Sequence, residues 1–141
     1  RQPIVLIGTK NQTHLKGAFF IPIFIWWRWN QTAHLCENAR NVLLGDYFKN
    51  KIVYINVMVN MSVDCDCCAT AEDPCMKDIG ILASTDPVAL DQSCIDLVYN
   101  STDPGKEHLI KKIESRNGLL TIKSAEEQKI GTREYELINI D

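Results

Sequence analysis

The chain has 141 residues, of which 45% are hydrophobic and 23% are charged, and its formal net charge is −3. This length suits one domain with a hydrophobic core, and the composition excludes a disordered or fibrous protein. The acidic balance argues against a nucleic-acid binder, because such proteins neutralise phosphates with lysine and arginine.

Short apolar segments alternate with helical patterns along the chain. Apolar, β-branched runs predict strands at 3–8, 51–61, 78–84 and 133–140. Apolar spacings of three and four predict helices at 32–48, 87–99, 106–116 and 124–130. The 32–48 helix has a stripe formed by Leu35, Ala39, Val42, Leu43 and Tyr47. We therefore expect a single α/β domain, a mixed sheet with helices packed on it.

Three details of these elements are more specific. Apolar residues of 51–61 occupy both alternating faces, which predicts a central strand covered on both sides. Asp86 followed by Pro87 predicts a capped helix start. Gly118 is expected to end the helix before it, and Gly131 to close the helix at 124–130.

The longest apolar run, residues 17–27 (GAFFIPIFIWW), is too short to span a membrane, because a spanning helix needs about 20 apolar residues. It predicts a buried strand with Pro22 at an edge or bulge. The chain starts at Arg1 without the pattern of a signal peptide, so we expect a fragment or a processed product.

Four of the six cysteines lie within eleven residues, directly after the strand at 51–61. Such clustering favours a metal site over a disulfide scaffold, and ligands of open α/β sheets bind at the carboxyl ends of strands. Cys65 and Cys67 project to the same side of an extended backbone, whereas Cys68 faces the other way. A turn through 69–74 could return Cys75, so four thiolates could hold zinc or an iron-sulfur cluster.

The same segment is strongly acidic. Residues 64–78 contain five acidic side chains and one lysine, a formal charge of −4 before any thiol ionises. This charge attracts cations and disfavours thiolates in the empty site, so a nucleophilic cysteine is not expected. Two alternatives to a cluster stay open, a zinc-stapled structural or interaction module and a thiol-disulfide redox domain that pairs Cys65 with Cys67.

Asp91 is a further candidate, because it falls in the helical stripe of Val88, Ile95 and Val98. A carboxylate there is costly unless it is paired or bound to a ligand, so it either points into a site or lies at the edge of a broader apolar face. Asp86 and Asp96 lie five residues from Asp91, about 140° around a helix on either side, so the three carboxylates cannot form one cluster. Cys36 and Cys94 are expected to be small buried hydrophobes.

The cysteine segment and the residues after it resemble a prokaryotic family of uncharacterised proteins described as iron-sulfur-centre proteins. The similar residues are Asp64-Cys-Asp-Cys67, Pro74, the stretch DIGILASTDPVALDQS at 78–93, and GTREYELI at 131–138. The resemblance extends over about 29–138, so 29–141 would form the family domain, like the carboxyl-terminal portion of a longer protein. Residues 1–28 fit poorly and are expected to pack on the same domain.

The resemblance implies a cytoplasmic α/β protein without a settled activity, often accompanied by a ferredoxin-type cysteine module. Matching positions are Asp64, Cys65, Asp66, Cys67, Asp78, Asp86, Pro87, Asp91 and Gln92. Cys68 and Cys75 do not match the family.

We therefore expect a metal or iron-sulfur cluster bound by Cys65 and Cys67, with a redox or electron-transfer role. Cys68 and Cys75 are additional candidate ligands, and the candidate acidic ligands, or hydrogen-bond partners of ligands, are Asp64, Asp66 and Asp91. A ferredoxin-type module or another redox partner is expected, without nucleic acid or membrane. A second copy of the chain could complete the ligand set.

Overall fold

The protein is described by a computed structural model, which defines residues 1–8, 51–64, 70 and 72–140. The predicted strand at 17–27 and the predicted helix at 32–48, with Cys36, lie outside these residues. Within them the chain forms four strands and three helices, and the expected α/β class is confirmed.

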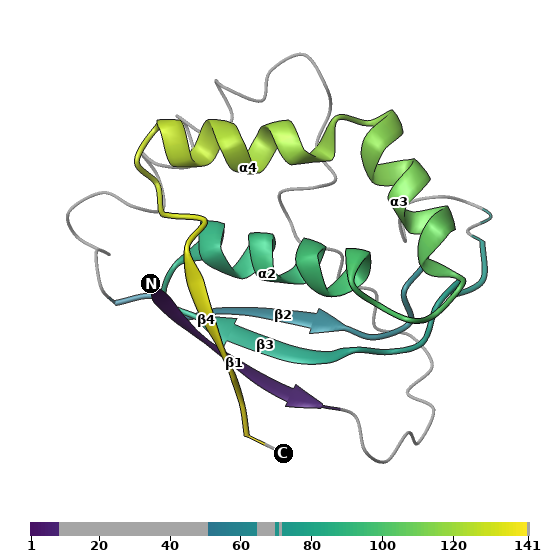
Figure 1. Ribbon diagram of the computed structural model, residues 1–141, viewed down its shortest axis with the longest axis horizontal. Helices are drawn as coiled ribbons and strands as arrows, with labels where there is room; N and C mark the ends of the chain where they lie inside the picture. The colour runs from purple at the N-terminus through teal and green to yellow at the C-terminus, as the bar shows by residue number, and fades with distance from the viewer. Residues whose placement is uncertain (9–50, 65–69, 71, 141) are drawn as a thin grey trace.

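The four strands form one mixed sheet. They are β1 (Gln2–Gly8), β2 (Tyr54–Met58), β3 (Gly80–Ser84) and β4 (Tyr135–Asn139), in the order β2-β3-β1-β4. β3 is antiparallel to both of its neighbours, and β1 is parallel to β4, so β1 and β2 point in the same direction (Figure 1). Their carboxyl ends therefore lie at the same end of the sheet.

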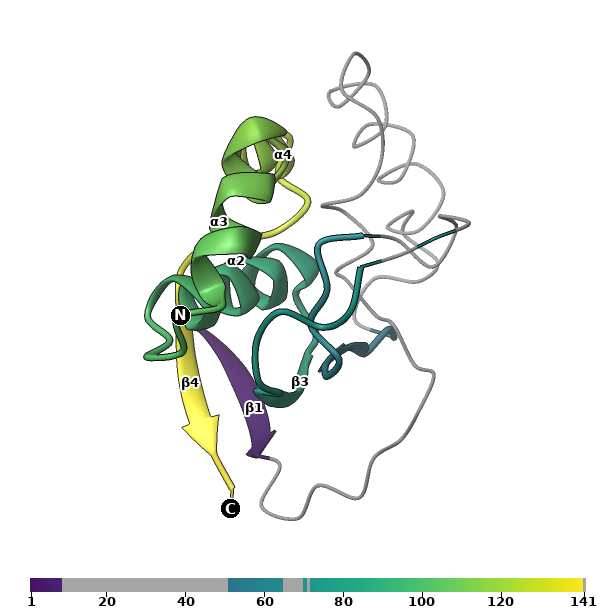
Figure 2. The ribbon, with the colours of Figure 1, turned by 90° about the vertical axis from the view of Figure 1, so that its right-hand side faces the viewer.

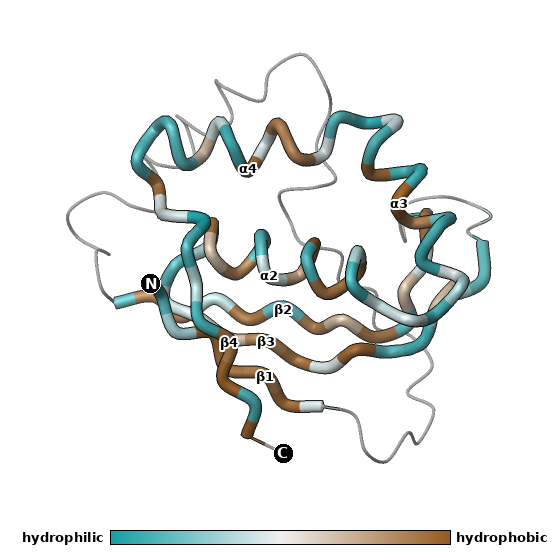
Figure 3. Tube along the Cα trace, in the orientation of Figure 1, coloured by the Kyte–Doolittle hydropathy of each residue, from teal (hydrophilic) through white to brown (hydrophobic). Residues whose placement is uncertain are grey.

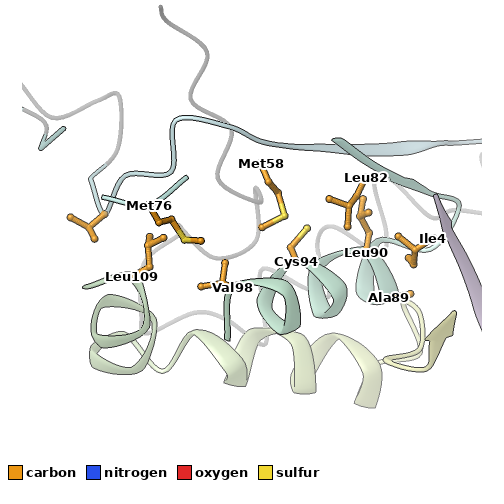
Figure 4. Packing of buried hydrophobic residues seen from close by; sticks show 10 residues of the cluster. Ile4, Met58, Met76, Leu82, Ala89, Leu90, Cys94, Val98 and Leu109 are labelled. Atoms are coloured by element: carbon orange, nitrogen blue, oxygen red, sulfur yellow. The ribbon is translucent and has the colours of Figure 1, made fainter. Parts of the chain in front are cut away.

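Three helices lie on one side of this sheet (Figure 2). They are α2 (Pro87–Tyr99), α3 (Lys106–Ser115) and α4 (Gly118–Glu127). α2 lies against the strands, where its Leu90 and Cys94 pack with Leu82 and Met58 of the sheet (Figure 4). A second apolar cluster joins the outer side of α2 to α4, with the members Val88, Ile95, Ile122, Ala125 and Ile130. The helix α2 is thus the middle layer of the domain.

The start of α2 is the one that the sequence predicts. Asp86 has an extended backbone, and its Oδ1 accepts hydrogen bonds from the backbone N–H groups of Val88 (2.9 Å) and Ala89 (3.0 Å). Pro87 follows at the first helical position, where a missing N–H costs nothing. Asp86 Oδ2 also accepts from Thr132 N at 3.0 Å, which ties the helix start to the segment before β4.

One sequence-based expectation is wrong, and a second is not met among the described strands. The strand predicted as central, 51–61, contains β2, which stands at one end of the described strand order, beside β3. Its apolar residues do occupy both faces, but only one of these faces packs against α2. The last helix begins at Gly118 rather than at 124. Asn117 adopts a left-handed conformation (φ 48°), which turns the chain sharply between α3 and α4, so the glycine opens a helix instead of ending one.

The other face of the sheet carries apolar side chains that are open to solvent. Figure 3 shows that β1 and β3 are hydrophobic along most of their length, as expected for strands that are apolar on both faces. Among the described helices, none combines the length and the hydrophobicity needed to cross a bilayer.

Candidate metal centre

The cysteine segment lies between β2 and β3, at the end of the sheet where β1 and β2 also terminate (Figure 1). Asp64 and Cys75 belong to the described residues. Cys65, Asp66, Cys67 and Cys68 lie outside them, so the structure describes the residues that flank these four in the sequence.

The chain leaves β2 in one limb of the segment and returns to β3 in a second limb. Close to the sheet, hydrogen bonds join these two limbs at more than one point. Ile79 N donates to the Met58 carbonyl at 2.9 Å, and Asn60 N donates to Asp78 Oδ1 at 2.7 Å. Farther out, Met61 and Met76 form an antiparallel bridge. The family-matching residue Asp78 therefore has a structural role, because its carboxylate holds Asn60 in a left-handed conformation (φ 51°).

The limbs stay joined up to the residue before the first cysteine. Ser62 Oγ donates to the Glu72 carbonyl at 2.8 Å and accepts from Asp64 N at 3.2 Å. Asp64 Oδ2 accepts from Glu72 N at 3.1 Å. We call these contacts the Ser62–Asp64–Glu72 clasp. The clasp therefore joins the described residues that flank 65–71 in the sequence, Asp64 and Glu72.

Helix α3 and the turn before it support the outer limb. Lys112 Nζ lies 3.6 Å from Asp64 Oδ1, and His108 Nδ1 lies 3.7 Å from Glu72 Oε2, although His108 and Glu72 are more than half exposed. The Asp103 carboxylate accepts from Lys77 N at 3.0 Å and from Gly105 N at 2.8 Å. These contacts hold the residues around Cys75 against the amino end of α3.

The backbone at Gly105 makes the closest approach between the amino end of α3 and the residues around Cys75. A Cβ atom at this position would lie 1.7 Å from the carbonyl oxygen of Cys75, so no larger residue fits without a shift of backbone. The turn Asp103-Pro104-Gly105 is a signal that the sequence does contain, since these three residue types favour turns. Its contact with the distant cysteine segment carries no such local signal.

Cys75 is a partly buried free thiol whose Sγ donates to the Met61 carbonyl at 3.4 Å. Burial raises the pKa of this thiol, and the nearby charges of Glu72 and Asp103 raise the pKa further. The thiol is therefore protonated at neutral pH and a poor nucleophile. This direction agrees with the expected effect of the acidic surroundings, although burial is its larger cause.

Asp91 lies away from the clasp, buried between α2 and β2. Its Oδ1 accepts from Asn56 Nδ2 at 3.0 Å, and the same amide lies 3.3 Å from Cys94 Sγ. Burial raises the pKa of Asp91 to about 7, although the Asn56 hydrogen bond works in the opposite direction. Of the two alternatives left open by the sequence, an acid at the edge of the apolar face is excluded, because only 5% of Asp91 is exposed.

The three carboxylates of the α2 region have separate partners, as their five-residue spacing predicts. Asp86 caps the helix, Asp91 bonds to Asn56, and Asp96 accepts from Gln92 Nε2 (2.9 Å) and Tyr135 Oη (2.7 Å). Cys94 is buried, as expected, and burial raises the pKa of its thiol to about 12. Within the described ranges, no three His, Cys, Asp or Glu side chains come together in a way that could hold a metal ion.

These features define an α/β domain with a clasped cysteine segment at the carboxyl end of β2. Over residues 8–96 the chain matches the model of a family described as a domain of unknown function, DUF362. The match covers more than half of the chain, which therefore belongs to this family. It contains β2, the cysteine segment, β3 and most of α2. No curated protein and no solved structure matches the chain.

Proposed function

We propose that the cysteine segment binds a metal, as an iron-sulfur cluster, with Cys65 and Cys67 as ligands and Cys68 and Cys75 as further candidates. The observation that carries this proposal is the Ser62–Asp64–Glu72 clasp. It hydrogen-bonds Asp64 to Glu72, two described residues that flank three cysteines in the sequence, and the fourth cysteine follows on the returning limb. Joining the ends of a ligand-bearing segment removes part of the entropy cost of gathering ligands around one ion.

The candidate ligands among the described residues, Cys75 and Asp64, could bind a metal only together with further ligands. Cys75 would have to lose its proton and its hydrogen bond to Met61 in order to bind a metal, and the acidic surroundings oppose that loss while the site is empty. A bound cation reverses this effect, because it supplies positive charge and deprotonates a coordinated thiol. Asp64 already bonds to Glu72 and faces Lys112, so its best role is to position Cys65.

A bound cluster would supply one-electron chemistry, in which the reduction potential depends on net charge, hydrogen bonds and exposure to solvent. The chain contributes several acidic side chains, which favour the more oxidised state of a cluster. This redox role is supported by the resemblance to iron-sulfur-centre proteins, and it requires a partner that exchanges electrons, such as a ferredoxin-type module.

Anaerobic purification, reconstitution with iron and sulfide, and metal analysis test the proposal. We expect iron and acid-labile sulfide in equal amounts and broad visible absorption that is bleached by dithionite. A colourless protein that contains only zinc would instead support a zinc-stapled structural module. A protein that retains neither metal after reconstitution would contradict metal binding altogether and favour a Cys65–Cys67 dithiol.

Matched cysteine variants test the assignment of ligands. Cys65→Ser and Cys67→Ser should each abolish binding of the cluster, whereas Cys94→Ala, which alters a buried cysteine of the core, should retain it. Asp64→Asn keeps the size of the side chain but weakens its contacts with Glu72 and Lys112. We expect about 10-fold to 100-fold weaker metal binding for this variant, as for other residues that orient ligands. Unchanged affinity would show that the clasp does not organise the site.

A further inference from the structure

A hollow lies between α2 and α4, and Asp91 forms part of its wall. Figure 1 shows α4 running alongside α2, on the side away from the strands. The hollow has an empty volume of about 200 Å³, part of which is open to solvent. This space suits a ligand of a few heavy atoms, because pockets for drug-sized ligands have roughly 300–1,000 Å³. The other residues of the wall are Pro87, Val88, Thr121, Ile122 and Ala125.

The described residues use only one oxygen of the Asp91 carboxyl group. Its Oδ1 accepts from Asn56 Nδ2 at 3.0 Å, and no other residue that the structure describes donates a hydrogen bond to this carboxyl. No lysine, arginine or histidine of the described ranges forms an ion pair with it. With an exposed fraction of 5%, Asp91 is nonetheless shielded from bulk water. Oδ2 is therefore a buried acceptor that lacks a partner among the described residues.

The described surroundings of Asp91 contain no positive charge. From β2, Asp91 faces the neutral amide of Asn56, and Cys94 of its own helix has a thiol whose pKa burial raises to about 12. From α4, the wall of the hollow contributes no titratable side chain. Burial raises the pKa of Asp91 to about 7, against the smaller effect of the Asn56 hydrogen bond. Buried charges in proteins are normally paired, so a cation in the hollow would stabilise the ionised carboxylate.

We propose that the hollow binds a primary ammonium group on a short aliphatic chain. An ammonium group donates up to three hydrogen bonds. Asp91 Oδ2 accepts one of them, and the hydroxyl of Thr121, the second polar side chain of the wall, accepts another. Val88, Ile122 and Ala125 offer apolar surface to the aliphatic chain. The hollow lies away from the cysteine segment, so this proposal does not depend on metal binding there.

Titration of the whole ¹³C-labelled chain with ethylammonium chloride, followed by NMR, tests the proposal. An alkylammonium stays protonated at pH 8 and at pH 5, as a lysine side chain does. At pH 8, where Asp91 is mostly ionised, the signals of Asp91 Cγ and of the Val88 and Ile122 methyl groups should shift together. Their half-saturation should fall below about 50 mM. At pH 5 the carboxyl is protonated, so half-saturation should require at least about 10-fold more probe.

Two matched probes separate the charge from the aliphatic chain. Sodium chloride at the same ionic strength supplies a cation without N–H donors, and ethanol supplies an aliphatic chain without a charge. Neither should give saturable shifts at the residues of the wall. Shifts of equal size with sodium chloride would show a general effect of salt and would overturn the proposal.

Substitutions on α2 and α4 test the two acceptors. Asp91→Asn keeps the size of the side chain and should remove the saturable shifts of the wall residues. Asp96→Asn is the matched control on the same helix, because the Asp96 carboxylate already accepts hydrogen bonds from two side chains, and it should retain binding. Thr121→Val removes the hydroxyl and should weaken binding by about 3-fold to 10-fold.

The same measurements give the results that would overturn the proposal. Unchanged affinity in Asp91→Asn would place the probe elsewhere, and a lack of saturation at pH 8 would show that the hollow does not bind it. A pKa of Asp91 at or below that of an ordinary aspartate, without probe, would show that another part of the chain already supplies the cation. If Asp91→Asn does not fold, the comparison of pH 8 with pH 5 in the native chain decides.

Discussion

Asp91 places a carboxyl group in a position where the helix α2 otherwise presents apolar side chains. The group is tolerated because Asn56 donates a hydrogen bond to it and because its raised pKa, about 7, keeps much of it neutral at neutral pH. A protonated carboxyl can also donate a hydrogen bond of its own. The residue therefore links the stability of the domain to pH.

Asp91→Asn should remove a pH dependence of folding. The pKa is about 7 in the folded protein, against about 3.9 for an aspartate in an unfolded chain. Well below the pKa of the unfolded chain, the carboxyl is protonated in both the folded and the unfolded state, so it does not lower the free energy of unfolding. As pH rises toward 7, the unfolded chain ionises first, so stability falls, by roughly 4 kcal/mol at most above pH 7. Urea unfolding at pH 4.5 and pH 8 should show the variant gaining stability over the native chain at the higher pH.

The exposed acid Asp73 provides the control for this measurement. Asp73→Asn makes the same chemical change at the surface and should leave the native pH dependence in place. If Asp91→Asn shows the same difference from the native protein at both pH values, the carboxyl is not the source of the linkage.

At the scale of elements, the start of α2 depends on one side chain that serves three backbone donors. Asp86 accepts hydrogen bonds from Val88, Ala89 and Thr132, and Gly131 leaves room for it, because a Cβ there would lie 2.1 Å from Asp86 Oδ1. The cap therefore also fixes where the chain enters β4, next to β1.

Asp86→Ala should destabilise the domain by about 2 kcal/mol, at the upper end of the range for N-caps, because the three donors are left without this acceptor. Asp86→Asn keeps an acceptor oxygen toward Val88 and Ala89 and should cost clearly less. Urea denaturation followed by far-UV circular dichroism measures both. Equal losses for alanine and asparagine would show that the negative charge, rather than the capping hydrogen bonds, stabilises the helix.

The elements that could be predicted from sequence are those with local signals. Asp86 and Pro87 mark a helix start because capping acts within three residues, and α2 has the predicted bounds. The prediction that Gly118 ends a helix was wrong because the role of this glycine depends on Asn117 and on close packing against Ile113. The Ile113 side chain would lie 3.1 Å from a Cβ added to the glycine. The place of β2 in the order of the described strands depends on strand pairing, which is a long-range property.

The candidate site divides in the same way. The clustering and acidity of the cysteine segment are visible in the sequence, and they lead to the hypothesis of a metal site. The clasp is not visible, because Ser62 and Glu72 are common polar residues whose pairing depends on the path of the chain between them. The burial of Asp91 could be anticipated from its helical stripe, but its partner Asn56 lies on a distant strand.

At the scale of the whole molecule, α2 belongs to both apolar clusters. Leu90, Cys94 and Val98 face the sheet, whereas Val88 and Ile95 face α4. A helix that is apolar around most of its circumference is stable only when it is enclosed by other elements. Loss of α4 would therefore expose one side of α2, and the sheet would have to retain a helix that is half solvated.

Ile122→Ala tests this coupling, because Ile122 is a buried residue of α4 in the cluster with Val88 and Ile95. The truncation should cost about 2–5 kcal/mol, as for other buried aliphatic side chains. If α2 couples the two clusters, far-UV circular dichroism and the ¹⁹F resonances of 3-fluorotyrosine at Tyr54 and Tyr135, which pack against the sheet-side cluster, should shift to lower urea concentration together.

Leu120→Ala is the matched change on the solvent side of α4, where the side chain is 54% exposed, and it should cost less than about 0.5 kcal/mol. Separate transitions in the Ile122→Ala variant, with helical signal lost before the tyrosine signal, would show that α4 unfolds alone. The sheet and α2 would then form an independent unit, and the clasp, which contacts α3 but not α4 in the described contacts, would survive the loss of α4. Coincident transitions would instead make the clasp and the packing at α4 parts of one folding equilibrium.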